Sequence, residues 1–258
     1  MNSSLVYCCV DGIARIVFNR PEVLNAINSD LAGEFLKACQ QIAVDDSVRV
    51  VVISGRGRAF MAGGDVAQFK QGLTSIAESL IDPMHEGLQI LSKLRTPVVA
   101  SVQGAAAGAG MSIALACDIV IAADNCRFTS AYVNLGTSCD LGVSWSLPRL
   151  VGLQRAMHMM LLSESVGADA AKQMGFVSRV VPLERLEAET EVIVQRLAKG
   201  APVAQGRLKA LLRTSLERTF EEQLAVERDG FVACAETRDF AEGVDAFIGR
   251  RAAIFSGN

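Results

Sequence analysis

Three short apolar runs constrain the fold of this 258-residue chain more than any other feature of its sequence. Arg49–Ser54, Pro97–Val102 and Asp118–Ala123 are rich in Val, Ile or Ala and show no polar–apolar alternation. Continuous runs of this length are typical of strands buried on both faces of a parallel sheet. Because helical patterns separate the runs, we predict an α/β fold with right-handed crossovers.

Turn residues, caps and apolar spacing predict the remaining elements of the first part of the chain. They are a hairpin of Leu5–Val10 and Ile13–Asn19 turning at Asp11-Gly12, a helix from an N-cap at Ser29 to about Val44, an extended segment Ala59–Ala62, and helices Ser79–Leu94 and Ala105–Ala116.

After Pro182 the pattern changes to one helix after another, and strands are no longer predicted. The predicted helices are Leu183–Lys199, Pro202–Thr214, Phe220–Cys234 and Asp239–Arg251. We therefore expect a core of residues 1–198 followed by a helical region of residues 199–258. The many apolar positions of this region indicate packing against another subunit.

Composition excludes several classes of function. A net charge of −3 with scattered Lys and Arg gives no basic surface for nucleic acid. Thr96–Cys117 carries no charge, but it contains Pro97 and Gly104 and ends at Asp118, so we expect buried elements and no membrane span. Seven cysteines without a CxxC pair are typical of a reduced, cytoplasmic protein, and two histidines make a dedicated metal site unexpected.

Two glycine-containing breaks are candidates for binding chemistry. In Phe60–Asp65 an extended segment stops at Gly63-Gly64, and Gly104–Gly110 leads into a helix through small residues only. Alone, the first could be a turn capped by Asp65 and the second a site of close helix–sheet packing. Together they could supply two free backbone N–H groups that bind one thioester oxygen.

Four segments resemble, in order and spacing, motifs of the enoyl-CoA hydratase/isomerase (crotonase) superfamily. They are Asn19–Ala26, Ala59–Asp65, Pro97–Gly104 with the small residues up to Ala116–Ile119, and Ala171–Val177. The resemblance covers nearly the whole chain. It implies a spiral of ββα repeats with a C-terminal helical trimerisation region, and a homotrimer or dimer of trimers. It also implies acyl-CoA thioester substrates and no further cofactor.

The resemblance also implies a set of site residues. Gly64 and Ala109 correspond to the residues whose N–H groups form the oxyanion hole. Phe247, Arg250 and Arg251 match a C-terminal segment that often contacts CoA from a neighbouring subunit. The positions expected along the CoA moiety are Leu24, Asn25, Ala26, Ala62, Gly63 and Asp65.

Departures from the family pattern bear on the reaction. The two glutamates that handle water in hydratases correspond here to Ser112 and Tyr132, which argues against ordinary hydratase activity. Asp140 matches the catalytic aspartate of phenylacetate-pathway and dienoyl-CoA isomerases, and the nucleophile of 4-chlorobenzoyl-CoA dehalogenase. His85 matches a histidine of that dehalogenase, but Tyr132 replaces its tryptophan. In dienoyl-CoA isomerases the position of Tyr132 carries a second acid.

Three functions remain open on these grounds. The first is a double-bond isomerase in which Asp140 moves a proton between two carbons. The second uses Asp140 as a nucleophile on an aryl-CoA, with His85 activating water. The third is a CoA-binding subunit with little chemistry. The acyl pocket is expected to include Gln68–Pro83, with Gly72 giving it mobility.

Each of these side chains also has a purely structural interpretation. Asp140 could be the N-cap of a helix that begins near Leu141, with its carboxylate on a backbone N–H. His85 could pack at a helix edge, Tyr132 could line the pocket or the core, and Asp65 could cap the loop that follows it.

Overall fold

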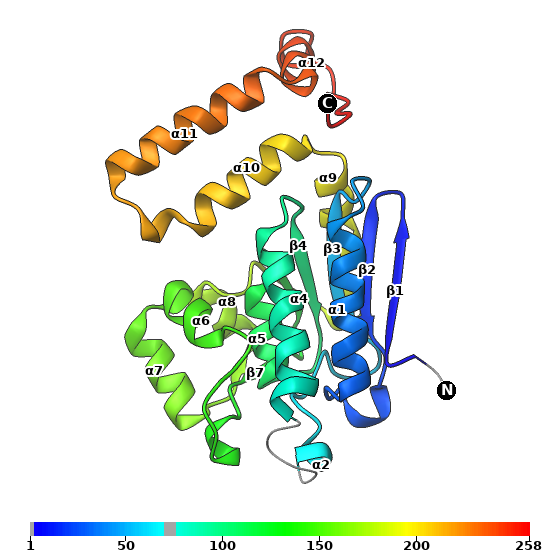
Figure 1. Ribbon diagram of the computed structural model, residues 1–258, viewed down its shortest axis with the longest axis vertical. Helices are drawn as coiled ribbons and strands as arrows, with labels where there is room; N and C mark the ends of the chain where they lie inside the picture. Colours follow the sequence, from blue (N-terminus) through cyan, green and yellow to red (C-terminus); the bar gives the residue numbers. More distant parts are fainter. Residues whose placement is uncertain (1–2, 70–75) are drawn as a thin grey trace.

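A six-stranded sheet with the order β1-β2-β3-β4-β6-β9 forms the centre of the molecule (Figure 1). The computed structural model describes residues 3–69 and 76–258, and the sheet lies within them. β1 and β2 form an antiparallel hairpin, and the other neighbouring strands run parallel. The predicted hairpin and buried parallel strands are therefore confirmed. The strands are β1 (Leu5–Val10), β2 (Ile13–Phe18), β3 (Val50–Gly55), β4 (Val98–Val102), β6 (Ile119–Ala123) and β9 (Arg179–Val181).

Alternate residues of these strands face two separate cores. Ile53 belongs to the larger core, which α1 (Ser29–Ala43) and α4 (Asp82–Lys93) cover, whereas Val52 belongs to the smaller core under α9 (Leu186–Ala198). Because side chains alternate along a strand, one run of apolar residues fills both layers. The sheet is thus covered by helices on both sides, as the absence of polar alternation predicts.

A second, three-stranded sheet was not predicted. It has the order β5-β7-β8, with β5 at Ala105–Ala107, β7 at Arg127–Thr129 and β8 at Val166–Gly167. The prediction of one helix over Ala105–Ala116 is therefore wrong at its start. β5 pairs parallel to β7, and the chain turns at Gly108 with φ 51° before α5 (Ala109–Ala116) begins.

Two other helix predictions need correction at their N-termini. The N-cap of α1 is Asn28, not Ser29, since the Asn28 side chain accepts a hydrogen bond of 3.0 Å from Leu31 N–H. The predicted helix Ser79–Leu94 consists of a π-helical turn, Ala77–Ile81, followed by α4.

Smaller elements complete the first part of the chain. The predicted extended segment Ala59–Ala62 makes only an isolated bridge, between Met61 and Ala106. None of the helices within residues 3–69 and 76–258 is both long and apolar enough to cross a membrane. The other helices are α2 (Val66–Phe69), α6 (Val143–Val151), α7 (Leu153–Leu162) and α8 (Ala168–Met174), with 3-10 turns at Pro21–Val23, Val133–Leu135, Leu183–Arg185 and Ser215–Glu217.

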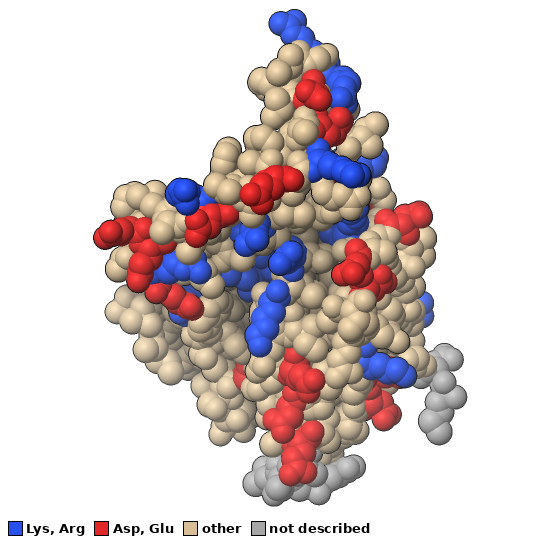
Figure 2. All heavy atoms as spheres, turned by 45° about the horizontal axis from the view of Figure 1, so that its top comes forward, with Lys and Arg blue, Asp and Glu red and all other residues tan. Residues whose placement is uncertain are grey.

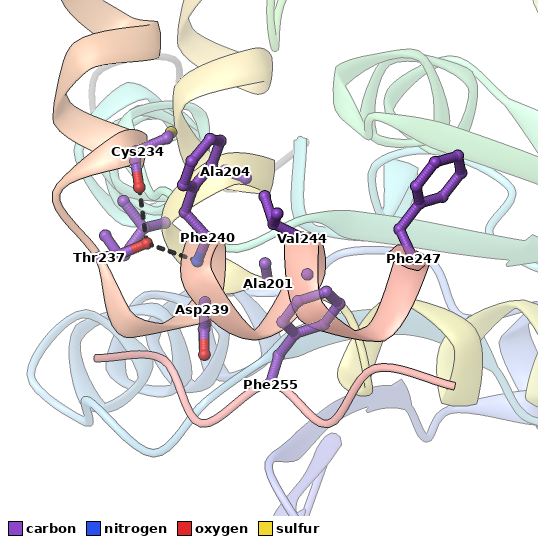
Figure 3. A pocket seen from close by; sticks show the side chains of 11 residues that line it. Ala201, Ala204, Cys234, Thr237, Asp239, Phe240, Val244, Phe247 and Phe255 are labelled. Carbon is purple, nitrogen blue, oxygen red and sulfur yellow. Dashed lines mark hydrogen bonds between the residues drawn. The ribbon is translucent and has the colours of Figure 1, made fainter. Parts of the chain in front are cut away.

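The last three helices, α10 (Pro202–Arg213), α11 (Phe220–Ala235) and α12 (Arg238–Ile248), project from one end of the body (Figure 1). We call them the C-terminal arm. Many of its apolar side chains are exposed, with Phe247 reaching 87%. A groove of about 440 Å³ between α10, α12 and the chain end is lined by Phe240, Val244 and Phe255, among others (Figure 3).

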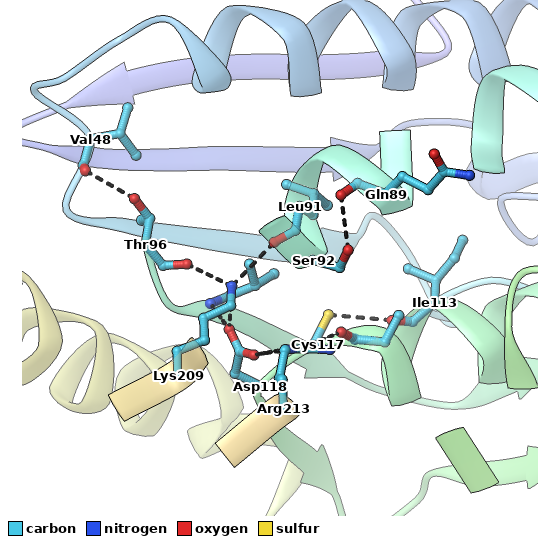
Figure 4. A network of polar contacts seen from close by, with 12 residues as sticks. Val48, Gln89, Leu91, Ser92, Thr96, Ile113, Cys117, Asp118, Lys209 and Arg213 are labelled. Carbon is cyan, nitrogen blue, oxygen red and sulfur yellow. Dashed lines mark hydrogen bonds and ion pairs between the residues drawn. The ribbon is translucent and has the colours of Figure 1, made fainter. Parts of the chain in front are cut away.

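Buried charges attach the root of the arm to the body (Figure 4). Lys209 Nζ lies 2.9 Å from Asp118 Oδ2 and donates to the carbonyls of Leu91 and Thr96. Arg213 Nη2 lies 2.6 Å from Asp118 Oδ1. Burial lowers the pKa of Lys209, and the Asp118 carboxylate opposes this shift.

The face in Figure 2 has Lys and Arg interspersed with Asp and Glu, so its charge is mixed.

Candidate active site

The two glycine-containing breaks meet in space. Met61 N–H donates to Ala105 O at 3.1 Å, and Ala107 N–H donates to Met61 O at 2.9 Å. A Cβ placed on Gly108 would lie 3.7 Å from Gly63 Cα. The end of β5 and the start of α5 therefore lie directly against the segment Met61–Gly64.

Two glycines of this junction have close neighbours, a backbone oxygen at Gly110 and the far end of the Phe69 side chain at Gly64. A Cβ on Gly110 would lie 2.2 Å from Met61 O, and a Cβ on Gly64 would lie 2.5 Å from the ring of Phe69. Neither distance is compatible with a larger residue unless its surroundings move. Phe69, at the end of α2, lies close to Gly64, and no sequence motif predicted this closeness.

The N–H groups of Gly64 and Ala109 have no hydrogen-bond acceptor within the described part of the chain. Ile27 N–H donates to Gly63 O and Asp65 N–H donates to Ile27 O, a pattern that passes over the Gly64 N–H. Ala109 is the first residue of α5, where a helix leaves its N–H groups unpaired. Across the described part of the chain, neither group donates to a protein acceptor. Whether they form an oxyanion hole stays a prediction.

Ser112, Tyr132 and Asp140 are joined by hydrogen bonds next to this junction. Tyr132 Oη donates to Asp140 Oδ1 at 2.6 Å and lies 2.8 Å from Ser112 Oγ. Ser112 is fully buried and Tyr132 is 9% exposed. Burial and the charge of Asp140 raise the pKa of Tyr132, so its side chain is a neutral phenol. Tyr132 is thus a buried residue whose hydroxyl holds the candidate base.

The interpretation of Asp140 as an N-cap is wrong. α6 begins at Val143, and its N-cap is Gly142, which has no side chain to offer. Leu141 and Gly142 both have positive φ, 51° and 79°, and this turn separates Asp140 from the helix. The carboxylate is directed to Tyr132 instead.

His85, on α4, contacts the backbone beside Asp140. Its Nε2 accepts a hydrogen bond of 3.2 Å from Leu141 N–H. The nitrogen acts as the acceptor in this contact. This contact fixes the turn that carries Asp140.

The loop expected to bind CoA is held by Asn25. Its Nδ2 donates to the carbonyls of Arg56 (2.9 Å), Ala59 (2.9 Å) and Phe60 (3.1 Å), and its Oδ1 accepts from Arg20 N–H at 2.9 Å. Asn25 is fully buried, so its side chain serves to hold the loop.

The other residues of the expected CoA loops lie in the same place. Leu24 O accepts from Ala62 N–H at 3.0 Å, and Ala26 O accepts from the Arg20 guanidinium. Asp65 is 3.1 Å from Arg20 Nη2, and its Oδ1 accepts from Ala67 N–H at 3.3 Å. The interpretation of Asp65 as a cap is therefore correct.

Phe247, Arg250 and Arg251 are not near these residues within one chain. They lie on or after α12, at the end of the molecule opposite α2 (Figure 1). Arg251 pairs with both oxygens of Glu242, at 2.6 and 2.7 Å, whereas Phe247 and Arg250 are exposed. Gly72, in the expected pocket segment Gln68–Pro83, lies outside the described residues.

Comparisons with known proteins identify the family and the fold of the chain. The family "enoyl-CoA hydratase/isomerase" matches residues 9–258. The chain is 34% identical to the 1,2-epoxyphenylacetyl-CoA isomerase of Escherichia coli, over 95% of both chains. It is 33% identical to the 2,3-dehydroadipyl-CoA hydratase of the same organism, over 99% of both. The crystal structure of an enoyl-CoA hydratase from Polaromonas superposes with a TM-score of 0.91 at 31% identity, covering 98% of this chain and 99% of the other.

The chain therefore belongs to the enoyl-CoA hydratase/isomerase family and has the crotonase fold. It is an acyl-CoA enzyme of that family, and its relatives include both isomerases and hydratases.

Proposed function

We propose that this enzyme is an isomerase that moves a double bond between 3-enoyl-CoA and 2-enoyl-CoA. The observation that carries the proposal is the side-chain set beside Gly64 and Ala109. Its hydrogen-bonded row joins one carboxylate, Asp140, to two neutral hydroxyls, Ser112 and Tyr132, which stand where hydratases of the family have glutamates. Adding water to an enoyl thioester requires groups that activate and protonate it, and hydroxyls are poor at both.

The proposed reaction needs only one base. The thioester oxygen lies between the N–H groups of Gly64 and Ala109, which stabilise negative charge on it. Asp140 removes a proton from C2 of the 3-enoyl thioester, and the electrons form a dienolate. The same carboxyl group then returns the proton to C4, and the double bond lies between C2 and C3. CoA enters as part of the substrate, and no other cofactor takes part.

Tyr132 gives Asp140 a defined orientation for this task. Its hydroxyl occupies Oδ1, which leaves Oδ2 to exchange the proton with the substrate. The His85 contact to Leu141 N–H holds the same turn from the α4 side. A base that must reach two carbons of one substrate benefits from such fixation.

The test is the initial rate of 3-enoyl-CoA conversion, followed by the absorbance of the conjugated thioester. We expect Asp140→Asn to lower the rate by about 10²–10⁴ while the protein stays folded. Asp46→Asn, an exposed change in the turn after α1, is the matched control and should leave the rate unchanged. The absence of a wild-type rate on short, long and aryl-substituted chains would refute the isomerase, as would an undiminished Asp140→Asn rate.

We also propose that residues 199–258 mediate self-association into a homotrimer or a dimer of trimers. Exposed apolar side chains of the arm support this, because patches of this kind mark interaction surfaces. Association would bring Phe247 and Arg250 of one copy toward the CoA bound by another. Sedimentation should show a single multimer that Phe247→Asp weakens. The most exposed of these side chains are Leu208, Leu212, Leu216, Phe220, Phe231, Phe247, Ile248 and Ile254.

A further inference from the structure

The hydroxyl of Ser112 lies between two acceptors. Its Oγ is 2.8 Å from Tyr132 Oη and 3.2 Å from Gly108 O, and the side chain is fully buried. A serine hydroxyl has one proton, so it can donate to only one of these oxygens at a time. Its choice depends on which oxygen is the better acceptor.

The charge on Asp140 determines that choice. Tyr132 is a neutral phenol with one proton, and an ionised carboxylate can only accept. Tyr132 therefore donates to Asp140, and its own oxygen accepts from Ser112. Hydrogen bonds in such a row polarise one another, so the ionised Asp140 draws the Ser112 proton toward Tyr132.

Proton uptake by Asp140 reverses this preference. A hydrogen bond to a neutral carboxyl is roughly half as strong as one to a carboxylate. Tyr132 Oη then becomes a weaker acceptor, and the Ser112 proton shifts to Gly108 O. If the proton arrives on the oxygen facing Tyr132, the phenol turns toward Ser112 and the result is the same. The hydroxyls only reorient, and the proton stays on Asp140 until it returns to the substrate.

Gly108 C=O and Ala109 N–H belong to one peptide group. A hydrogen bond accepted by a carbonyl oxygen draws electrons from the nitrogen and makes the N–H a stronger donor. We propose that Ser112 is a positioning residue that strengthens the Ala109 donor whenever Asp140 holds the substrate proton. This is the interval in which the thioester oxygen carries its negative charge. The inference rests on the proposed function, since it takes Ala109 N–H as an oxyanion donor.

The expected effect on turnover is modest. Loss of an oxyanion donor lowers kcat by about 10²–10³, and one neighbouring hydrogen bond strengthens another by roughly 10–30%. Losing about 10–30% of a donor's contribution of 2–3 decades in kcat corresponds to a loss of about two- to eightfold in kcat for Ser112→Ala. Because the gain exists only when the enolate is present, KM should change little.

Spectroscopy of a bound ligand separates this role from a structural one. Cinnamoyl-CoA has no proton that isomerisation could move, and its absorbance shifts to the red when the thioester oxygen is polarised. At saturation, Asp140→Asn, which replaces the carboxylate by a neutral group, should increase the red shift in the wild-type background. The increase should be smaller in Ser112→Ala, since the hydroxyl that transmits it is missing. The difference between the two increments measures the coupling, because the direct effect of the lost charge is present in both.

Tyr132→Phe provides a second test. Without the phenol oxygen, Ser112 donates to Gly108 O permanently, so the extra increment on Asp140→Asn should also vanish. Equal increments in the wild-type, Ser112→Ala and Tyr132→Phe backgrounds would overturn the coupling and leave the proposed function intact. A wild-type complex without any red shift would overturn the oxyanion assignment itself, and the coupling with it.

Discussion

Asn25→Ala should destabilise the protein and misplace the glycine turn at Gly63-Gly64. The substitution removes the four hydrogen bonds of the Asn25 side chain, two of which go to the buried carbonyls of Ala59 and Phe60. Phe60 O loses its partner, which costs about 1–3 kcal/mol for a buried polar group, whereas Ala59 O keeps Gln103 Nε2 at 3.5 Å. The two part-buried partners regain water, and alanine is strained at the φ of 59° found here. Together with a strain of about 1–2 kcal/mol, we expect a loss of roughly 2–5 kcal/mol in the free energy of unfolding.

Urea unfolding followed by circular dichroism, at one fixed protein concentration, measures this loss. Asn134→Ala is the control, because its one side-chain hydrogen bond, to Ser163, is exposed. It should change the free energy by less than about 0.5 kcal/mol. A loss below about 1 kcal/mol for Asn25→Ala would show that the loop keeps its path without the side chain, and the reasoning would be refuted.

Two further results are expected. Gly110→Ala should lower turnover by about 10²-fold, because its Cβ would meet Met61 O at 2.2 Å and displace the donor groups. Gly33→Ala is the control, because a Cβ there has no neighbour within 4 Å. It should stabilise α1 by about 0.5–1 kcal/mol. The Arg251 side chain lowers the pKa of Glu242 from 4.5 to about 2, so the pair contributes stability above pH 4.5 that is lost as the pH falls toward 2. Melting temperatures over this range should fall less steeply for Glu242→Gln; an unchanged slope would contradict the assignment.

Local patterns predicted five of the six strands of the main sheet because those strands carry their signal within themselves, whereas the short edge strand β9 was not predicted. The runs in β3, β4 and β6 are long, apolar and bounded by polar residues, and they are buried on both faces. β5 has no such signal. Its three alanines also suit a helix, and only pairing with Arg127–Thr129 makes them a strand. Tertiary contact overrode helix propensity there.

The candidate site was predictable in its residues but not in its contacts. The resemblance indicated Asp140, Tyr132 and Ser112 one at a time, but not the hydrogen bonds that join them across 8 and 20 residues of sequence. The capping interpretation of Asp140 failed because Leu141 takes a positive φ, which no local rule predicts for a leucine. Asn25 was expected at the ligand, and its side chain instead holds the loop.

The ion pairs of Lys209 and Arg213 with Asp118 also have a consequence for the order in which the chain folds. Lys209 and Arg213 reach back over 91 to 118 residues to Leu91, Thr96 and Asp118. Contacts so distant in sequence form late, after the strands that present the acceptors are in place. A nascent chain that ends before Lys209 would leave the Asp118 carboxylate without its two cations. Docking of α10 is therefore expected to be the event that completes the body, and a truncated body should be recognisable by slow, incomplete refolding.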